Sequence, residues 1–199
     1  RIFRILLIQK RKLENQNMVV ISIKNSGKLF EDDIRKSFPK DCLVHRLRDT
    51  AQSYNNSSKT SFTWNNECDF FVFDTKNRIF YCLELKSTKF KTMNWQVSKE
   101  DLSSKMIKYH QIEALTTFAN YSNVMAFFVF NFRDDTSGNQ KTYFQNIKDF
   151  HRMIKEIKRK SFDEVHLIQY GARKLTGIKK RTRYSWDIKE ILDTLGSTY

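Results

Sequence analysis

The stretch ECDFFVFDTKNRIFYCLELKST, residues 67–88, decides the fold, because it holds two hydrophobic runs that are each interrupted by acidic residues. The runs are rich in aromatic and aliphatic residues and are typical of two adjacent β-strands. A charged side chain inside such a strand costs several kcal/mol unless something binds it. Asp69 and Glu84 therefore need a partner.

A two-residue turn at Lys76 and Asn77 would pair the two strands so that Asp69 faces Glu84. Directly opposed residues point to the same side of a sheet, and Lys86, two residues beyond Glu84, shares that side. A slip of one residue would separate the two carboxylates onto opposite faces. Carboxylates this close repel each other, and a hard divalent cation such as Mg²⁺, with Mn²⁺ as a substitute, relieves the repulsion. Lys86 would then orient a water molecule or stabilise charge on a phosphate. The alternative is a surface hairpin with an ordinary ion pair.

The composition indicates one basic domain with a nucleic-acid partner. The chain has 199 residues, 40% of them hydrophobic, and 36 Lys and Arg against 22 Asp and Glu, which gives a net charge of +14. Such a charge favours a polyanion, and the alternative is a basic protein without particular affinity. Residues 1–17 are interpreted as a non-native or disordered basic extension, with a DNA-binding arm as the alternative, and residues 18–199 as a single domain.

The three cysteines predict reduced, buried thiols and no zinc site, because no C-x-x-C spacing occurs. The hairpin register places Cys68 and Cys82 on opposite faces of the sheet, which argues against a disulfide between them. No apolar stretch approaches the about 20 residues that a bilayer crossing needs. We expect a cytoplasmic protein of a bacterial or phage-infected cell.

The remaining pattern predicts an α/β domain with a mixed central sheet. Apolar spacing indicates helices over residues 25–38, 103–121, 147–161 and 186–195, and strands over 42–48, 124–132, 142–147 and 165–170. The strand 124–132 is apolar on both faces and is therefore expected at the centre. The polar residues 49–67 form a long loop, and such loops are usually functional.

Several segments together resemble one nuclease family. The segments GKLFEDDIRKSFP, RLRDT, ECDFFVF, YCLELKST, KYHQIEAL, FFVFNFR, TYF and RTRYSWDI resemble, in this order, the RecU-type Holliday junction resolvases and especially their phage and mobile-element relatives. That family belongs to the PD-(D/E)xK nuclease superfamily. The resemblance implies a restriction-endonuclease-like mixed β-sheet flanked by helices, and a Mg²⁺-dependent homodimer that nicks two strands of a four-way junction.

The resemblance also implies roles for particular residues. Asp69 and Glu84 would bind the metal with help from the Leu85 carbonyl, and Lys86 would assist the attacking water. Glu31 would complete the site, and Gln111 matches a polar helix position beside it. The extended stalk that enters the junction centre in this family maps onto residues 49–67, which here are short and hold Lys59 as their one cation.

Positive charge near the predicted site and in the last third of the chain suggests where DNA binds. Residues 151–183 hold eleven Lys and Arg against three Asp and Glu, and KKRTRY interleaves arginine with an aromatic residue. The alternative for any single residue is a solvated, charged surface. The predicted DNA contacts are Lys28, Arg46, Arg48, Lys59, Lys89, Arg133, Arg181 and Arg183.

These observations favour a metal-dependent, structure-specific endodeoxyribonuclease that resolves four-way junctions by paired nicks during recombination. Two alternatives stay open: a sequence-specific, restriction-type nuclease on linear duplex, and a non-catalytic DNA-binding accessory protein. No Gly-rich phosphate loop occurs, so a nucleotide cofactor is not expected. We interpret His110, on the apolar stripe of its helix, as a histidine of the core or one that supports the site residues, and not as a general base.

Overall fold

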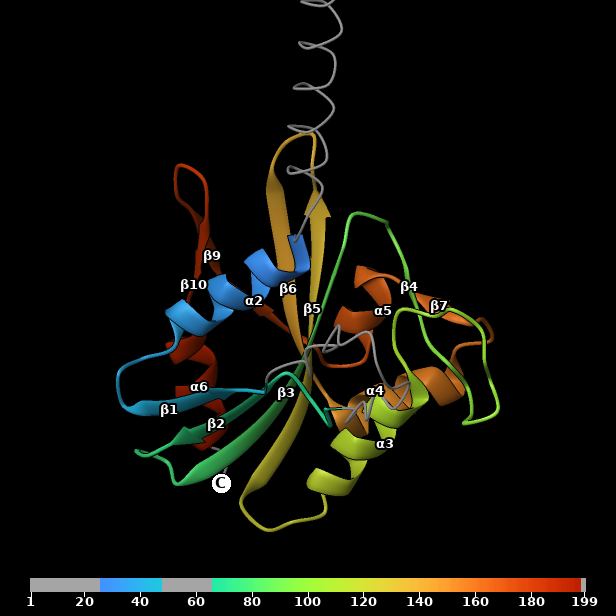
Figure 1. The fold of residues 1–199 in the computed structure, drawn as a ribbon, viewed down its shortest axis with the longest axis horizontal. Coiled ribbons are helices and arrows are strands. Elements are labelled where there is room, and N and C mark those ends of the chain that lie inside the picture. The colour runs from blue at the N-terminus through green and yellow to red at the C-terminus, as the bar shows by residue number, and fades with distance from the viewer. Residues whose placement is uncertain (1–25, 48–65, 198–199) are drawn as a thin grey trace, which may run out of the picture.

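The computed structural model describes residues 26–47 and 66–197, which form a mixed β-sheet covered by helices on both faces (Figure 1). The sheet has the strand order β1-β2-β3-β5-β6-β8. Its strands are β1 (Cys42–Arg46), β2 (Phe70–Asp74), β3 (Ile79–Thr88), β5 (Val124–Asp134), β6 (Asn139–Asn146) and β8 (Arg173–Leu175). The pair β3–β5 is parallel and the other pairs are antiparallel, so the predicted mixed sheet is confirmed.

Five helices and two small ribbons flank this sheet in the described part of the chain. The helices are α2 (Ser26–Ser37), α3 (Tyr109–Phe118), α4 (Ile147–Glu156), α5 (Glu164–Gln169) and α6 (Ile188–Gly196). The ribbons pair β4 (Met93–Asn94) with β7 (Ser161–Phe162), and β9 (Gly177–Lys179) with β10 (Tyr184–Trp186). None of the helices in the described ranges is long and apolar enough to cross a bilayer.

The sheet separates two hydrophobic cores. On one face α2, α6 and the β9–β10 ribbon bury Phe30, Trp186 and Leu192 against the sheet. On the other face α3, α4 and α5 bury residues such as Phe150 and Leu167. Because helices cover both faces, β5 is buried on both sides, and its central position between β3 and β6 confirms the prediction.

The β2–β3 hairpin has the predicted register but a longer turn. Phe71 faces Cys82, and the ladder ends where Asp74 faces Ile79, so four residues, 75–78, form the turn in place of the expected two. The Asp74 carboxylate accepts hydrogen bonds from the backbone N–H groups of residues 76 and 77, at 3.0 and 3.2 Å. This local bonding stabilises a turn that spacing alone did not reveal.

The strand predicted over residues 165–170 is wrong, because this segment forms α5. Asp163 caps the helix: its side chain accepts hydrogen bonds from the N–H groups of Val165 and His166, both at 3.1 Å. Only Leu167 of this short helix is buried. The cap and one-sided packing override the β-propensity of the Val and Ile residues.

The prediction that Cys68 and Cys82 lie on opposite faces is also wrong, since both belong to the core beneath α3 and α4. Strand β2 begins only at Phe70, so strict alternation does not extend back to Cys68. Its thiol donates to the Phe70 carbonyl at 3.4 Å. A hydrogen bond with Cys82 and burial both raise the pKa of Cys68, and all three thiols are free. Residues 1–17, Arg48, Lys59 and nearly all of the expected loop 49–67 lie outside the described residues.

Candidate functional site

The predicted acidic residues lie where β2 begins alongside the middle of β3, close to the start of α3 (Figure 1). Asp69 directly precedes β2, and Glu84 and Lys86 lie on β3. Gln111 lies in the first turn of α3, which packs on the same face of the sheet. The hairpin and one helix therefore assemble the site.

Asp69 bonds to the edge of β3 through both its backbone and its side chain. Its N–H donates to the Leu83 carbonyl at 3.0 Å, and its Oδ2 accepts from the Leu85 N–H at 2.7 Å. The N–H and C=O of one strand residue lie at the same edge, so the Leu85 carbonyl is on the Asp69 side. One carboxylate and one carbonyl oxygen are thus held beside each other.

Glu84 is a buried carboxylate, with only 2% of its surface exposed. Its Oε1 forms an ion pair with Lys86 Nζ at 2.7 Å and accepts a hydrogen bond from Gln111 Nε2 at 2.6 Å. The Lys86 side chain is itself only 15% exposed. A buried charge is tolerated when it is paired and hydrogen-bonded, which is what this arrangement provides.

The two ends of the Gln111 amide have different partners, and these partners set its orientation. Its Oε1 accepts a hydrogen bond from the Lys108 N–H at 3.0 Å, so Nε2 must face Glu84. The same side chain therefore caps the start of α3 and orients the carboxylate in β3. Sequence reasoning placed Gln111 here only through the family resemblance.

Glu31 on α2 joins this region through Arg46 at the end of β1. The Arg46 guanidinium donates to Glu31 Oε2, with Nε at 2.9 Å and a second, shorter contact from its terminal nitrogen. Arg46 faces Phe70 in the ladder, and the next residue, Leu47, donates its N–H to the Asp69 carbonyl at 2.9 Å. The ion pair therefore ties α2 to the segment that carries Asp69.

His110 lies near Lys86 and not in the core, so the first of the two interpretations from its helical spacing is wrong. The residue is exposed. Partial desolvation lowers its pKa, and the positive charges of Lys86 and Lys108 lower it further. Its helix starts at Tyr109, later than the apolar spacing indicated. Met106 and Ile107 therefore lie outside the helix, and the apolar stripe predicted from them does not include His110.

The oxygen atoms available to a cation are the carboxylates of Asp69 and Glu84 and the carbonyl of Leu85. The described residues contain no group of three or more His, Cys, Asp or Glu side chains placed to hold a metal ion. Mg²⁺ nevertheless is usually held by one or two carboxylates plus waters and substrate phosphates. Two carboxylates and a main-chain oxygen therefore fit Mg²⁺, and the absence of thiolate or imidazole ligands disfavours zinc.

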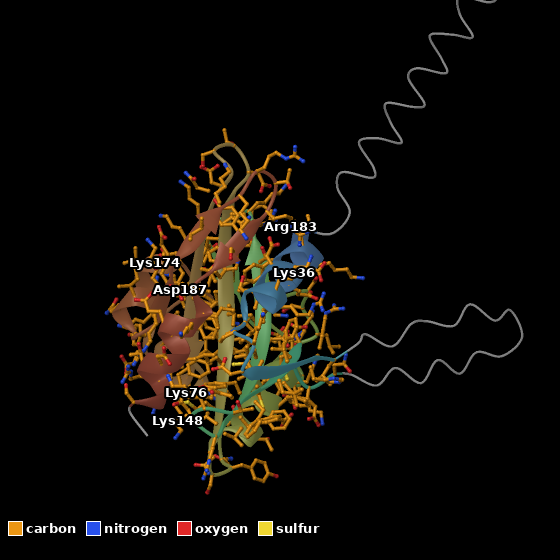
Figure 2. All side chains as sticks on the ribbon, turned by 90° about the vertical axis from the view of Figure 1, so that its left-hand side faces the viewer. Lys36, Lys76, Lys148, Lys174, Arg183 and Asp187 are labelled. Atoms are coloured by element: carbon orange, nitrogen blue, oxygen red, sulfur yellow. The ribbon has the colours of Figure 1, made fainter. Side chains whose placement is uncertain are left out.

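The predicted DNA contacts fall into two groups. Lys28, Lys89 and Arg181 are exposed. Arg133 and Arg183 instead form ion pairs, with Asp135 at 3.1 Å and with Asp33 at 2.6 Å. Figure 2 shows Arg183 beside α2, with the exposed Lys36 and Lys174 on the same side of the molecule. Arg183 therefore has a structural role, and DNA contact by any of these residues stays a prediction.

A buried polar row across the sheet was not found from the sequence. Ser87 donates to Asn131 Oδ1 at 2.9 Å, and Asn131 Nδ2 donates to Thr142 Oγ1 at 2.8 Å. Asn131 is fully buried, and it is the one polar residue in the apolar segment 124–132. A polar residue within an apolar strand was the sequence feature from which this row could have been predicted. The row stabilises the sheet directly beyond Lys86, since Ser87 follows it on β3.

Comparisons with known proteins give a sequence relative and solved structures of similar fold. No protein-family model matches the chain. It is 34% identical over 127 residues to the SPbeta prophage-derived uncharacterized protein YotM of Bacillus subtilis strain 168, a match that covers 63% of this chain. The chain spans 58% of the length of that relative. Among solved structures, Hjc of Archaeoglobus fulgidus, a Holliday junction resolvase, is similar with a TM-score of 0.42 and 14% identity, over 71% of this chain and 91% of Hjc.

Proposed function

We propose that this protein is a Mg²⁺-dependent endodeoxyribonuclease that acts on branched DNA, with four-way junctions as its substrate. The observation that carries the proposal is the meeting of Asp69, Glu84 and Lys86 where β2 and β3 come together. Acidic oxygens that can hold a metal ion, beside an ammonium group that can stabilise phosphate charge, are suited to phosphodiester hydrolysis.

Each residue has a role in this proposal. Asp69, Glu84 and the Leu85 carbonyl would hold Mg²⁺, and the bound ion would lower the pKa of a water molecule and stabilise charge on the scissile phosphate. Lys86 places its positive charge next to the attacked phosphate, and Gln111 holds Glu84 in position. Glu31 and Arg46 support the segment that carries Asp69.

The choice of substrate rests on charge and on the family resemblance. A net charge of +14 favours a polyanion, and phosphate contacts supply most of the affinity for DNA. The motifs that resemble RecU-type resolvases run through the chain in the family's order. Paired nicks across a junction require two active sites, so the proposal includes a homodimer. The match to a prophage protein supports an origin in a phage or an integrated element.

A second candidate, a non-catalytic DNA-binding protein, is favoured by one specific observation. The Glu84–Lys86 ion pair and the bond from Leu85 to Asp69 give both carboxylates partners within the protein. A purely structural role would require the same contacts. Cleavage assays of the two carboxylate variants separate this candidate from the nuclease.

The test is incubation of the purified protein with a labelled four-way junction and with a linear duplex of the same sequence, each with and without Mg²⁺. We expect paired nicks in the junction that depend on Mg²⁺ and are lost in Asp69→Asn and Glu84→Gln, while both variants still bind the junction. Asp32→Asn is the matched control, since Asp32 lies on α2 and its nearest described cation, Arg35, is 3.8 Å away. Unchanged cleavage by both variants would exclude the proposed site, and equal cutting of the linear duplex would favour the restriction-type alternative.

A further inference from the structure

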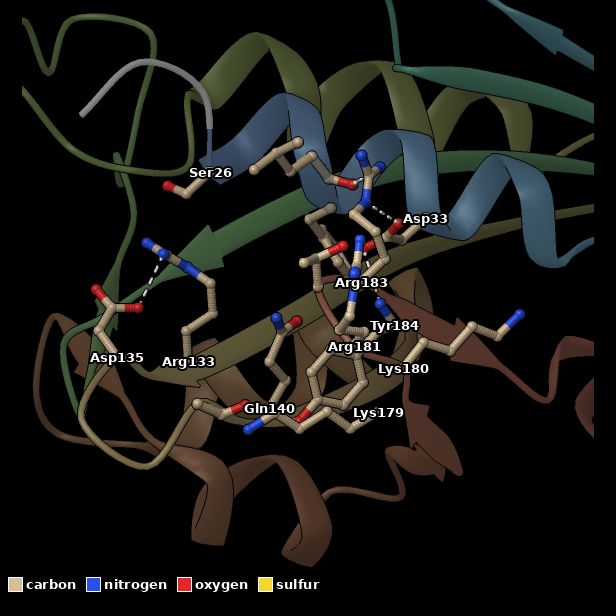
Figure 3. Close-up of a pocket in the computed structure, with 14 residues that line it drawn as sticks. Ser26, Asp33, Arg133, Asp135, Gln140, Lys179, Lys180, Arg181, Arg183 and Tyr184 are labelled. Atoms are coloured by element: carbon tan, nitrogen blue, oxygen red, sulfur yellow. Dashed lines mark hydrogen bonds and ion pairs between the residues drawn. The ribbon is translucent and has the colours of Figure 1, made fainter. Parts of the chain in front are cut away.

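A basic cavity lies apart from the proposed cleavage site, on the face of the sheet that α2 covers. Its volume is ≈ 250 Å³, and α2, the β5–β6 turn and the β9–β10 hairpin surround it (Figure 3). The cations that line it are Arg133, Lys179, Lys180, Arg181 and Arg183, and the acids are Asp33 and Asp135. The lining therefore has a net positive charge of three.

The two acids in the lining are already neutralised by two of the arginines. Arg183 binds Asp33 at 2.6 Å and the Leu29 carbonyl at 3.2 Å, so it fastens the hairpin to α2. Arg133 binds Asp135 at 3.1 Å. The excess charge therefore lies on Lys179, Lys180 and Arg181, of which the last two are exposed at the hairpin turn.

The Arg133 side chain offers a donor that the described part of the protein does not use. Its Nε is buried, and no acceptor within residues 26–47 and 66–197 bonds to it. Because this Nε has almost no accessible surface, an anion in the cavity would interact with the charge of the Arg133 guanidinium and not with Nε itself. Ser26, the first residue of α2, also lines the cavity, and the positive end of a helix dipole favours an anion.

We propose that this cavity binds a phosphate of the DNA backbone and thereby holds one arm of the substrate next to the cleavage site. The placement of that arm next to a cleavage site depends on the proposed nuclease function. The cavity lies between two hairpins, β5–β6 and β9–β10, that project at the same end of the molecule (Figure 1). A basic opening between projecting hairpins suits an extended backbone better than an enclosed metabolite.

Helix α2 connects the cavity to the cleavage site. Ser26 lines the cavity, and Glu31, five residues later, binds Arg46 beside the Asp69 segment. Five residues correspond to about 7.5 Å along a helix axis. A DNA arm held at the cavity would therefore lie along the helix that also contacts the segment carrying Asp69.

The test measures junction binding by fluorescence anisotropy in EDTA, so that no cleavage occurs, over a series of salt concentrations. The variant is Lys180→Ala with Arg181→Ala. The control is Lys158→Ala with Arg159→Ala, which removes the same charges from exposed positions after α4, on the opposite face of the sheet. We expect about tenfold weaker binding for the first variant and a salt slope reduced by about 1–2, with little change for the control.

An equal loss in both variants would overturn the proposal, because it would show only a general effect of net charge. Unchanged binding by the hairpin variant would overturn it as well. Inorganic phosphate is the competing probe: saturation of the cavity at low concentration without any effect on DNA binding would assign it to a free anion. Failure to find nuclease activity would leave this binding result intact, so the two proposals can fail separately.

Discussion

The amide nitrogen of Gln111 lies 2.6 Å from Glu84 Oε1, while the amide oxygen of the same side chain accepts from the Lys108 N–H. One residue therefore couples the start of α3 to a buried carboxylate in β3. If that carboxylate binds a metal ion, the position of α3 controls the geometry of the site.

Replacement of Gln111 by Ala is expected to lower junction cleavage by about 10- to 100-fold, the usual cost of removing a residue that orients a metal ligand. The measurement is the single-turnover cleavage rate as a function of Mg²⁺ concentration. The variant should need a higher Mg²⁺ concentration to reach half of its maximal rate. Gln96→Ala is the matched control, because Gln96 Oε1 accepts from the Tyr109 N–H at the start of α3. Equal losses in both variants would mean that Gln111 acts only by capping the helix.

Replacement of Lys86 by Gln is expected to reduce cleavage by about 10²–10³-fold, because it removes the positive charge to which the proposal assigns stabilisation of the phosphate. Calorimetric titration with Mn²⁺ should still show binding, since the proposed oxygen ligands remain. Lys99→Gln, at an exposed lysine with no assigned role, should change the rate little. Full activity of the Lys86 variant would exclude its proposed role.

Replacement of Arg183 by Ala is expected to destabilise the fold by about 1.5–3 kcal/mol, because Asp33 is 6% exposed and would lose its charged partner. Arg183 is 33% exposed, so solvent screening favours the lower end of this range. Urea unfolding monitored by circular dichroism measures the change. Arg181→Ala, two residues away, should stay within about 0.5 kcal/mol of the wild type. A similar loss of stability in the Arg181 and Arg183 variants would indicate a general effect on the β9–β10 hairpin and not the loss of the ion pair with Asp33.

The stability of the protein should depend on the ionisation of Glu164. A hydrogen bond from Lys141 at 2.8 Å, followed by one from Tyr143, lowers the pKa of Glu164 below its usual value of 4.5. A lowered pKa contributes stability that is present above pH 4.5 and is lost as the pH falls through the folded-state pKa. Glu164→Gln should therefore be less stable than the wild type at pH 7, with a difference that shrinks as the pH falls below 4.5 and through the lowered folded-state pKa. A pH-independent difference would indicate lost packing and not lost charge.

The two hydrophobic runs in 67–88 and the polar turn between them were sufficient for the hairpin and its register. Phe71 opposite Cys82 follows from counting alone, and only a local device, the Asp74 side chain, changed the turn. The central position of β5 could also be predicted from the sequence, because a strand that is apolar on both faces must be buried on both faces.

Other features could not be read in this way. The segment that forms α5 has β-branched residues, yet the Asp163 cap and the burial of Leu167 make it a helix. The position of Cys68 depends on where β2 starts, and the exposure of His110 depends on where α3 starts. The ends of helices and strands depend on hydrogen bonds to particular side chains, and the periodicity of apolar residues does not report these bonds.

The sequence by itself determined the mixed sheet, the pairing of the strands around Asp69 and Glu84, and the excess of positive charge, because all three follow from local pattern and composition. Only the tertiary structure decided that Gln111 reaches Glu84, that Arg46 holds Glu31, and that a hairpin from the C-terminal part closes a basic cavity against α2. These contacts join residues 15 to 150 positions apart. Such pairs form only when both faces of the sheet are packed, and nothing in local spacing encodes them.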